Sequence, residues 1–318
     1  MALFLITGGA GFIGSNLVEA LLAAGHGVRV LDSFATAPRH NLDPFAGRFE
    51  LIEGDIRDLN TCLRAAKGAD FVLHQAALGS VPRSVADPVT THDVNAGGTL
   101  NMLLAARDAR ARRFVFASSS SIYGDQPQPE GAAGPGPKVE TMYPRPLSPY
   151  AVAKLAAESY CRVFWRAYGL PTVSLRYFNI FGPRQDPSSQ YAAVVPKFAA
   201  ALLDGSRPTI FGDGEQSRDF THVANAVAAN LAACEAGEIA FGETFNIGCG
   251  TSFSVRHLLT TLEGLSGRRA EIDFQPPRAG DVRDSLADIA KAKRLMGYDP
   301  KIGFDEGMEL TWAWYRRG

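Results

Sequence analysis

The residues that decide the fold lie at the start of the chain, where the apolar run Leu3-Phe4-Leu5-Ile6-Thr7 is followed by Gly8-Gly9-Ala10-Gly11-Phe12-Ile13-Gly14. The apolar run is typical of a buried strand, and the stretch Ile13–Ala24 predicts a helix. Glycines at 8, 11 and 14 allow a tight turn between the two and let the backbone approach a pyrophosphate. The N–H groups that open the helix then face that anion.

An acidic residue stands where a dinucleotide site needs one. Asp32 ends the next predicted strand, 18 residues after Gly14, and Ser33 follows it. A carboxylate there accepts hydrogen bonds from both adenosine ribose hydroxyls and repels a 2′-phosphate, which favours NAD over NADP. The alternative is that Asp32 only caps a loop. We expect Asp55-Ile56, after the third strand, beside the adenine.

Strand and helix patterns alternate through the first half of the chain. The predicted strands are Leu3–Thr7, Val28–Leu31, Phe49–Glu53, Phe71–His74, Phe114–Ala117 and Thr172–Tyr177, and the predicted helices include Ile13–Ala24, Asn60–Ala66 and Thr99–Arg110. This alternation predicts an α/β fold, a doubly wound parallel Rossmann sheet. We place it in residues 1–178, with a smaller C-terminal α/β domain in 179–318 that partly crosses back. The Pro- and Gly-rich segment from Gln126 to Pro146 predicts an exposed loop.

Composition excludes several classes of protein. The 318 residues are 46% hydrophobic and 20% charged, as in ordinary globular proteins, and the net charge of -1 gives no field that attracts nucleic acid or an anionic membrane. No run approaches the roughly 18 apolar residues of a membrane span. The four cysteines, at 62, 161, 234 and 249, form no close pair and no metal-like spacing. We expect a cytoplasmic protein without a metal site.

A catalytic pair is predicted at Tyr150-Ala151-Val152-Ala153-Lys154. Residues four apart share one face of a helix, so the Lys154 ammonium should lower the pKa of the Tyr150 phenol. The run Ser118–Gly124 directly follows a predicted strand, where open α/β sheets hold their ligands. The alternative for these serines is an ordinary solvated loop.

Taken together, the motifs resemble the extended short-chain dehydrogenase/reductase family, in its NAD-dependent nucleotide-sugar epimerase and dehydratase branch. The resemblance covers essentially the whole chain and is greatest to bacterial UDP-N-acetylglucosamine 4-epimerases. The residues that carry it are Thr7–Gly14, Asp32, Asp55, His74–Ala77, Asn95, Ser118–Gly124, Tyr150–Lys154, Arg176–Asn179, Gly212–Phe220 and Arg278–Asp281.

The resemblance implies a mechanism and a cofactor site. Tyr150, as phenolate, takes the proton of the sugar 4-hydroxyl, Ser119 hydrogen-bonds the same oxygen, and Lys154 also binds the nicotinamide ribose. Hydride passes from C4 to NAD and returns to the other face of a 4-keto sugar. The implied cofactor-binding residues are Gly8, Gly11, Phe12, Ile13, Asp32, Ser33, Asp55, Ile56, Ala76, Ala77, Asn95, Ser118, Tyr150, Lys154 and Tyr177.

The resemblance also implies a site for the UDP-sugar, in which Arg218 and Arg278 contact the diphosphate and ribose and Phe211 packs on the uracil. Arginine suits a diphosphate because its planar fork makes paired hydrogen bonds. The implied substrate-binding residues are Gly79, Ser80, Ser119, Ser120, Ser121, Asn179, Val195, Phe211, Arg218, Arg278, Asp281 and Ser285.

The choice within the branch depends on a few positions. Similar dehydratases carry an Asp-Glu pair where this chain has Ser120 and Ser121, which favours an epimerase. Similar uronate enzymes carry Arg at the position of Asp186, which disfavours UDP-glucuronate, although Arg184 and Arg83 are near in sequence. In similar epimerases a Tyr at the position of Ser285 confines the pocket to unsubstituted hexoses, so the resemblance implies that the small Ser285 leaves room for a 2-acetamido group. We therefore expect UDP-GlcNAc and UDP-GalNAc, with UDP-glucose and UDP-galactose as the alternative.

Other classes of function remain as alternatives. A non-catalytic dinucleotide-binding regulator tends to lose the Tyr or Lys, and both are present. A reductase that releases its cofactor conflicts with the UDP-type motifs. Family resemblance implies a homodimer through Thr99–Arg110 and Tyr150–Tyr168, and the alternative is that these apolar helices are buried within one subunit. Two departures from the family are the long loop before Tyr150 and Asn225, where many relatives have Asp.

Overall fold

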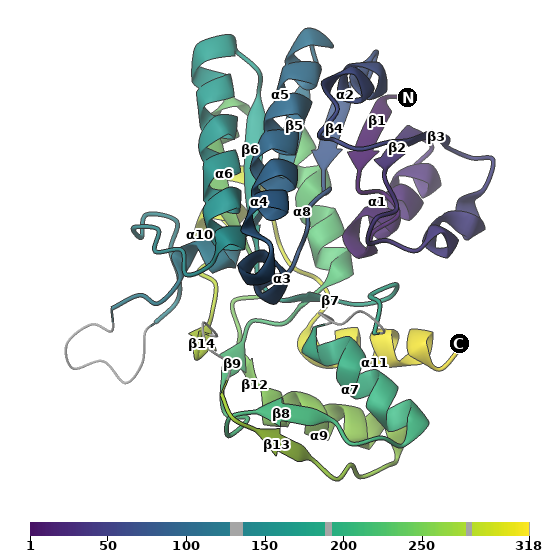
Figure 1. The fold of residues 1–318 in the computed structure, drawn as a ribbon, viewed down its shortest axis with the longest axis vertical. Helices are drawn as coiled ribbons and strands as arrows, with labels where there is room; N and C mark the ends of the chain where they lie inside the picture. The colour runs from purple at the N-terminus through teal and green to yellow at the C-terminus, as the bar shows by residue number, and fades with distance from the viewer. Residues whose placement is uncertain (128–135, 188–192, 278–281, 318) are drawn as a thin grey trace.

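A seven-stranded parallel sheet forms the larger part of the molecule (Figure 1). The computed structural model describes residues 1–127, 136–187, 193–277 and 282–317. The strand order is β3-β2-β1-β4-β5-β6-β11, with β1 (Leu3–Thr7), β2 (Gly27–Asp32), β3 (Glu50–Glu53), β4 (Phe71–His74), β5 (Arg113–Ser119), β6 (Thr172–Tyr177) and β11 (Glu243–Ile247). The six predicted strands and the doubly wound Rossmann fold are confirmed.

Helices cover both faces of this sheet. One face packs against α1 (Phe12–Ala23), α8 (Val223–Glu235) and α10 (Ala290–Met296), and the other against α2 (Leu59–Ala66), α5 (Gly98–Asp108) and α6 (Pro149–Tyr168). The short helices α3 (Val81–Ala86) and α4 (Pro88–His92) and a π-helical turn (Asp93–Gly97) lead into α5. In the described part of the chain, no helix has the length and apolar character needed to cross a membrane.

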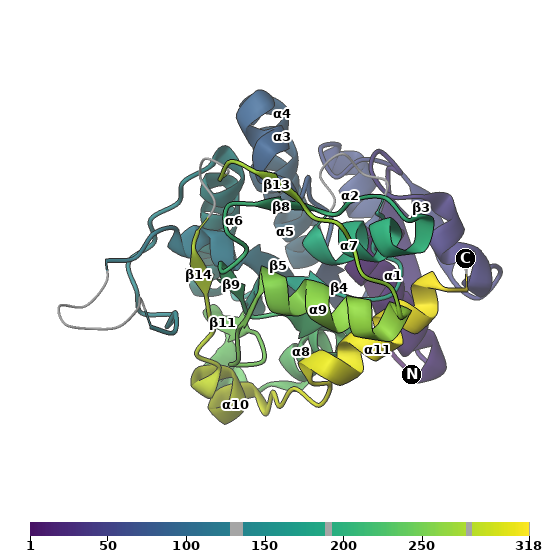
Figure 2. The same ribbon diagram turned by 90° about the horizontal axis from the view of Figure 1, so that it is seen from below.

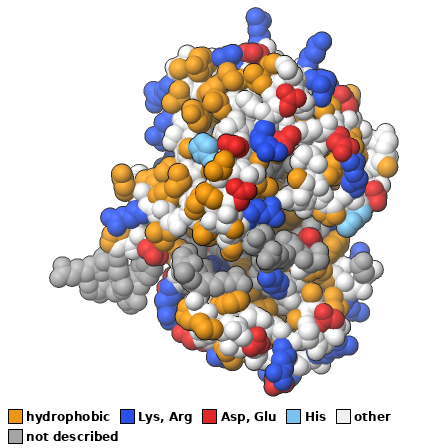
Figure 3. All heavy atoms as spheres, viewed as in Figure 1, with side chains coloured by type: hydrophobic (Ala, Val, Ile, Leu, Met, Phe, Trp, Pro, Cys, Tyr) orange, Lys and Arg blue, Asp and Glu red, His pale blue; other side chains and the backbone are white. Residues whose placement is uncertain are grey.

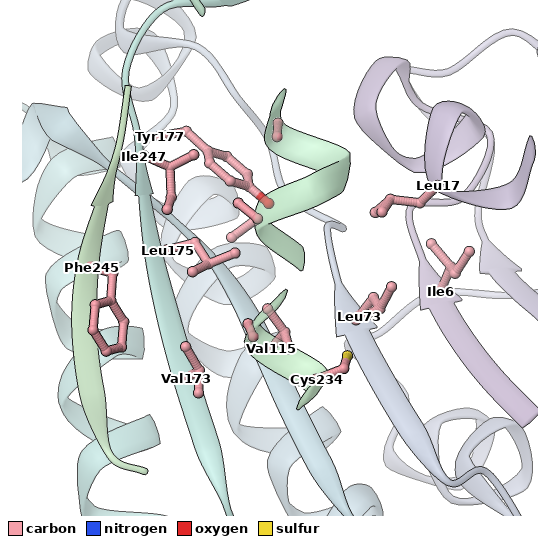
Figure 4. Packing of buried hydrophobic residues seen from close by; sticks show 14 of the residues in the cluster. Ile6, Leu17, Leu73, Val115, Val173, Leu175, Tyr177, Cys234, Phe245 and Ile247 are labelled. Atoms are coloured by element: carbon pink, nitrogen blue, oxygen red, sulfur yellow. The ribbon is translucent and has the colours of Figure 1, made fainter. Parts of the chain in front are cut away.

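The core explains why the strands read as almost continuous apolar runs, since a parallel sheet covered by helices has no solvent-facing side. Figure 4 shows Ile6, Leu73 and Val115 on three neighbouring strands, beneath α1 and α8. Phe245 of β11 belongs to the same cluster and is fully buried. Thus β11, a strand that the sequence did not predict, completes this core at the edge beside β6.

A smaller unit lies against the edge of the sheet where β1, β4 and β5 end (Figures 1 and 2). Its strand pairs are β7 (Ile180–Phe181) with β10 (Thr221–His222), β8 (Thr209–Phe211) with β13 (Asp273–Gln275), and β9 (Ser217–Arg218) between β12 (Phe253–Ser254) and β14 (Asp284–Ser285). Helices α7 (Val194–Asp204), α9 (Val255–Ser266) and α11 (Phe304–Tyr315) enclose a separate core. Elements β11, α8 and α10 return to the large sheet, so part of the segment after residue 179 belongs to the larger unit. The division of the chain into two domains at residue 179 stays a proposal.

The loop from Gln126 to Pro146 differs from the exposed loop that we expected. Residues 128–135 lie outside the described residues, but Lys138 beyond them is only 3% exposed. Its backbone N–H donates to Leu286 O at 2.8 Å, and its carbonyl accepts from Asn246 Nδ2 at 2.8 Å and from Asp288 N at 2.9 Å. Hydrogen bonding to β11 and to the segment 286–288 therefore holds this end of the loop against the body of the protein.

Asn225 explains one departure from the family. This buried side chain at the start of α8 donates to Ile302 O at 2.8 Å and accepts from the N–H groups of Lys301 and Ile302 at 3.0 and 3.1 Å. An aspartate cannot donate when ionised, so Asn225→Asp should lower the free energy of unfolding by about 1–3 kcal/mol. Chemical denaturation at neutral pH measures this. The exposed Glu235→Gln on the same helix is the control, and equal midpoints for both variants would contradict the prediction.

Candidate active site

A continuous groove runs along the carboxyl ends of the strands and into the smaller unit. The groove consists of four adjoining hollows that share lining residues: Gly8 and Gly11 line the first two, Tyr150 and Tyr177 the second and third, and Asn179 and Arg218 the third and fourth. Apart from Asn95, every described residue of the predicted cofactor and substrate sets lines one of them.

The glycine turn leaves no space for side chains between β1 and α1. A Cβ on Gly14 would stand 2.1 Å from Gly8 O, and one on Gly8, at φ +67°, would stand 2.7 Å from Ala76 N. Among the described residues, no side chain caps the first N–H groups of α1. This cradle fits a pyrophosphate, because the backbone can approach the anion and the free N–H groups face it.

The acidic residue of the cofactor motif is fixed at the end of β2. Asp32 is buried, and its Oδ2 accepts from Ala10 N at 2.9 Å and its Oδ1 from Phe34 N at 2.8 Å. Burial raises the pKa of Asp32, and these backbone hydrogen bonds lower it. Asp32 lines the first hollow together with Ser33, Asp55, Ile56, Ala76 and Ala77. A held carboxylate in this place fits the two ribose hydroxyls of an adenosine.

Two residues of the predicted cofactor set make other contacts in the structure. The amide of Asn95 accepts from Leu78 N at 2.8 Å and donates to Leu78 O at 3.2 Å, so it holds the turn beside the groove. Tyr177 OH donates to Gln75 Oε1 at 3.3 Å and accepts from Asn230 Nδ2 at 2.7 Å. Their contact with the cofactor stays a prediction.

The predicted catalytic pair, Tyr150 and Lys154, lies on one face of α6, as its spacing indicated. Lys154 Nζ is 5.9 Å from the centroid of the Tyr150 ring and donates to Ala117 O at 2.6 Å. Burial lowers the pKa of Lys154 to about 7. Burial raises the pKa of Tyr150, and a hydrogen bond with Ser119, rather than Lys154 as we expected, lowers it. The reason for this difference is that the ammonium is directed at a strand carbonyl and not at the phenol.

The serine run begins inside the sheet, since β5 extends through Ser119. Ser119 Oγ accepts from Ser121 N at 3.2 Å and from Ser121 Oγ at 2.9 Å, and Ser119–Ser121 line the third hollow together. Ser118 Oγ instead donates to Glu158 Oε2 at 2.9 Å in the protein interior. The structure thus brings Ser119 to Tyr150, and the predicted cofactor contact of Ser118 remains untested.

The smaller unit supplies the other wall of the groove. Arg218 and Ser285 are register partners in the β9–β14 pair, and Arg218 Nη1 donates to Ser217 O and Arg283 O, both at 2.8 Å. Gly79 and Ser285 line the third hollow, Ser80 lines the second, and Phe211 and Val195 line the fourth. Arg278 and Asp281, which we predicted to contact UDP, lie outside the described residues.

Strained backbone marks the same groove. Phe34, Asn179 and Arg184 have positive φ values of 54°, 27° and 69°. Asn179 and Arg184 line the hollows, and Phe34 directly follows the cofactor-site residues Asp32 and Ser33. Such conformations cost free energy and collect at functional sites.

Sequence reasoning missed several residues of the groove. Lys138 lines the third hollow, and Gln75, Thr36, Ala37, Pro38 and Asn41 line the cofactor end. Gln75 belongs to the motif His74–Ala77, and its position beside Ala76 was the signal that could have identified it. Lys138 follows a Gly/Pro segment, where no spacing or periodicity indicates burial.

The sequence profile of the NAD dependent epimerase/dehydratase family matches residues 4–248. The chain belongs to this family. A UDP-glucose 4-epimerase of Mycolicibacterium smegmatis is 40% identical over 316 residues, 98% of each chain. A crystal structure of Thermus thermophilus UDP-glucose 4-epimerase with NAD is 39% identical, with a TM-score of 0.89 and 99% of each chain covered. UDP-N-acetylglucosamine 4-epimerase of Methanobrevibacter ruminantium, in complex with UDP-N-acetylmuramic acid, is 35% identical, with a TM-score of 0.91 and 99% and 98% covered.

Membership in this family supports the prediction that the cofactor is NAD. NAD is the cofactor of the family, and the relatives named above are UDP-sugar 4-epimerases, which are isomerases. The glycine cradle and the fixed Asp32 carboxylate suit this dinucleotide on geometric grounds.

Asp32→Asn tests the adenosine end of the NAD site. The amide keeps one acceptor oxygen but turns an NH₂ group toward N–H or hydroxyl donors, so NAD affinity should fall by about 10- to 100-fold. Isothermal titration of cofactor-stripped protein with NAD measures the loss. Glu53→Gln, an exposed change at the end of the neighbouring strand β3, should leave the affinity unchanged. Equal affinity in D32N and E53Q would contradict the role of Asp32.

Proposed function

We propose that this protein catalyses the NAD-dependent 4-epimerisation of a UDP-hexose, most readily UDP-GlcNAc and UDP-GalNAc. The observation that carries the choice of sugar is the third hollow. Part of its lining is small, at Gly79, Ser120, Ser121 and Ser285, and Tyr150, Ser119 and Arg218 line the same hollow. A hexose held between them has room beside Ser285 for an acetamido group.

In the proposed reaction, Ser119 and Tyr150 hold the sugar 4-hydroxyl, and the Tyr150 phenolate oxygen takes its proton. NAD, when bound, accepts the hydride from C4 and returns it to the opposite face of the 4-keto sugar. Tyr150 then gives the proton back to O4, so that no proton or hydride is consumed over the cycle. The hydrogen bond with Ser119 lowers the pKa of Tyr150 and so favours the phenolate as the proton moves, and Lys154 is held on the same face of α6 by Ala117 O.

Two alternatives find less support in the side chains of the groove. Elimination of water needs a carboxylic acid by the sugar, and of the described residues in the third hollow only Asp284 carries a carboxylate, which accepts from Ser217 Oγ at 2.7 Å. Arg184, which we considered for a uronate carboxylate, donates to Asn16 Oδ1 at 2.8 Å and pairs with Glu19 of α1. Lys138 lines the third hollow, and its amino group could face the carboxylate of a uronate, so UDP-glucuronate is included in the test below.

The first test is NMR equilibration of the purified protein with UDP-GlcNAc, UDP-glucose and UDP-glucuronate in separate tubes. We expect inversion at C4 in all tubes that react, fastest for UDP-GlcNAc. Faster turnover of UDP-glucose would keep the mechanism and overturn the argument from Ser285. Absence of turnover with all three sugars, even with added NAD, would overturn the proposed function.

Ser285→Tyr tests the pocket wall directly. The ring should fill the space for the acetamido group and lower kcat/KM for UDP-GlcNAc by about 100-fold, and kcat/KM for UDP-glucose should stay within about threefold. Ser206→Tyr, the same exchange at an exposed position, is the control. Parallel losses on both sugars would show that Ser285 does not select between them.

We also propose a homodimer through α5 and α6. Met102, Leu103 and Phe164, which suggested the interface, are buried within the subunit, so they support the alternative of internal burial. Other apolar residues of α6 are exposed, including Val152 at 49% and Val163 at 50%. Figure 3 shows hydrophobic side chains gathered over these helices.

Sedimentation of the wild type and of Val163→Glu tests the dimer. We expect a dimer for the wild type and a monomer for the variant, because a carboxylate in an apolar contact lacks a partner. A wild type that stays monomeric at all concentrations would exclude the dimer.

The four free cysteines fit the cytoplasm, which we propose as the compartment of this protein.

A further inference from the structure

A buried carboxylate outside the predicted site joins α6 and β5, which carry the predicted catalytic residues, to β6. Glu158 lies on α6, one turn beyond Lys154 and two beyond Tyr150, and is 8% exposed. Its Oε2 accepts from Ser118 Oγ of β5 at 2.9 Å and from Arg176 Nε of β6 at 3.0 Å. Its Oε1 accepts from Arg176 Nη2 at 2.5 Å.

Each partner of Glu158 neighbours a residue of the groove. Ser118 and Arg176 face each other in the β5–β6 ladder, and the next pair in that ladder is Ser119 with Tyr177. The two-pronged Arg176 contact has a fixed geometry, since a guanidinium and a carboxylate meet through two parallel hydrogen bonds. The carboxylate therefore ties α6 to both strands at the level of Ser119.

The same ion pair is braced from behind. The Arg176 guanidinium carbon lies 4.7 Å from the centroid of the Tyr123 ring, and Tyr123 OH donates to Asn246 Oδ1 of β11 at 2.6 Å. A buried ion pair is weak evidence for stability, because well-packed apolar side chains often serve equally well. What this pair supplies is a defined position for α6 relative to β6, the strand beside β5.

Two contacts one helical turn apart determine the rotation and height of α6 against the sheet. One is Glu158 with Ser118, and the other is Lys154 Nζ with Ala117 O at 2.6 Å. We propose that Glu158 is a positioning residue that, through Ser118 and Arg176, sets the Tyr150 phenol against the Ser119 hydroxyl. This rests on the proposed function for its effect on turnover, because Tyr150 and Ser119 are the groups that handle the sugar 4-hydroxyl.

Two variants separate positioning from folding. Ser118→Ala removes one hydrogen bond and leaves the ion pair intact, and Glu158→Gln keeps an acceptor but loses the two-pronged contact. Each should lower kcat by about 10-fold and leave KM within about twofold, because the sugar still binds but the proton transfer is misaligned. Tyr298→Phe removes one buried hydrogen bond, to Gly248 O at 2.9 Å, at a residue that does not line the groove, and is the matched control.

A direct titration gives a readout that does not depend on turnover. The hydrogen bond from Ser119 lowers the pKa of Tyr150, so a Ser118→Ala protein with a displaced Ser119 should show a raised Tyr150 pKa. Ultraviolet difference titration of the NAD-loaded proteins measures it, with the matching Tyr150→Phe proteins subtracted. In turnover, the acid side of the pH profile should move to higher pH, because less phenolate is present at a given pH.

The outcomes distinguish this proposal from the proposed function. A wild type that turns over no UDP-hexose overturns the proposed epimerase activity. The titration of Tyr150 does not need turnover, so it still tests the positioning role of Glu158. An unchanged Tyr150 pKa in Ser118→Ala overturns the positioning role. A fall in kcat that merely follows lost NAD or lowered melting temperature, to the extent seen in Tyr298→Phe, also overturns it. A raised pKa with normal NAD content supports it.

Discussion

The close approach of α1 to the end of β1 is the constraint on which the rest of the structure depends. Gly14 lies so near the carbonyl of Gly8 that not even a methyl group fits between them. Because the backbone meets itself there, the start of α1 faces the carboxyl edge of the sheet with its N–H groups free for an anion. Asp32 and Tyr177 are the last residues of β2 and β6, and the serine run begins in the last residues of β5, at this same edge. One backbone contact thereby places the predicted dinucleotide cradle at the same edge as the predicted catalytic side chains.

The chemistry of the groove depends on buried polar groups that are each tied to backbone or to another side chain. Lys154 is held by a strand carbonyl, Asp32 by two N–H groups, and Glu158 by Ser118 and Arg176. An ion pair at the surface contributes little to stability, whereas a buried polar side chain with hydrogen-bond partners keeps one orientation. The groove is therefore built for accurate placement of a proton acceptor, which suits a reaction whose two half-steps occur at one carbon atom.

Most of the larger unit and of the catalytic set follows from local patterns. Continuous apolar runs predict the buried strands, and the spacing of Tyr150 and Lys154 predicts their common face. Glu158 could not be found in this way. It lies on the same face of α6 as Tyr150 and Lys154, but only the tertiary fold shows that its partners are Ser118 and Arg176. The burial of Lys138 and the return of β11 to the large sheet also depend on contacts between distant segments, which leave no periodic trace in the sequence.

The return of the chain to the large sheet has a consequence for how such proteins diversify. The path leaves the sheet after β6, comes back for α8 and β11, leaves once more, returns with α10, and leaves a third time for α11. The smaller unit thus consists of three excursions from one scaffold. Recombination that exchanged the sugar-recognising part between relatives would have to join the chains at several points at once. Gradual substitution within the excursions, at positions such as Ser285, is the simpler route to a new substrate.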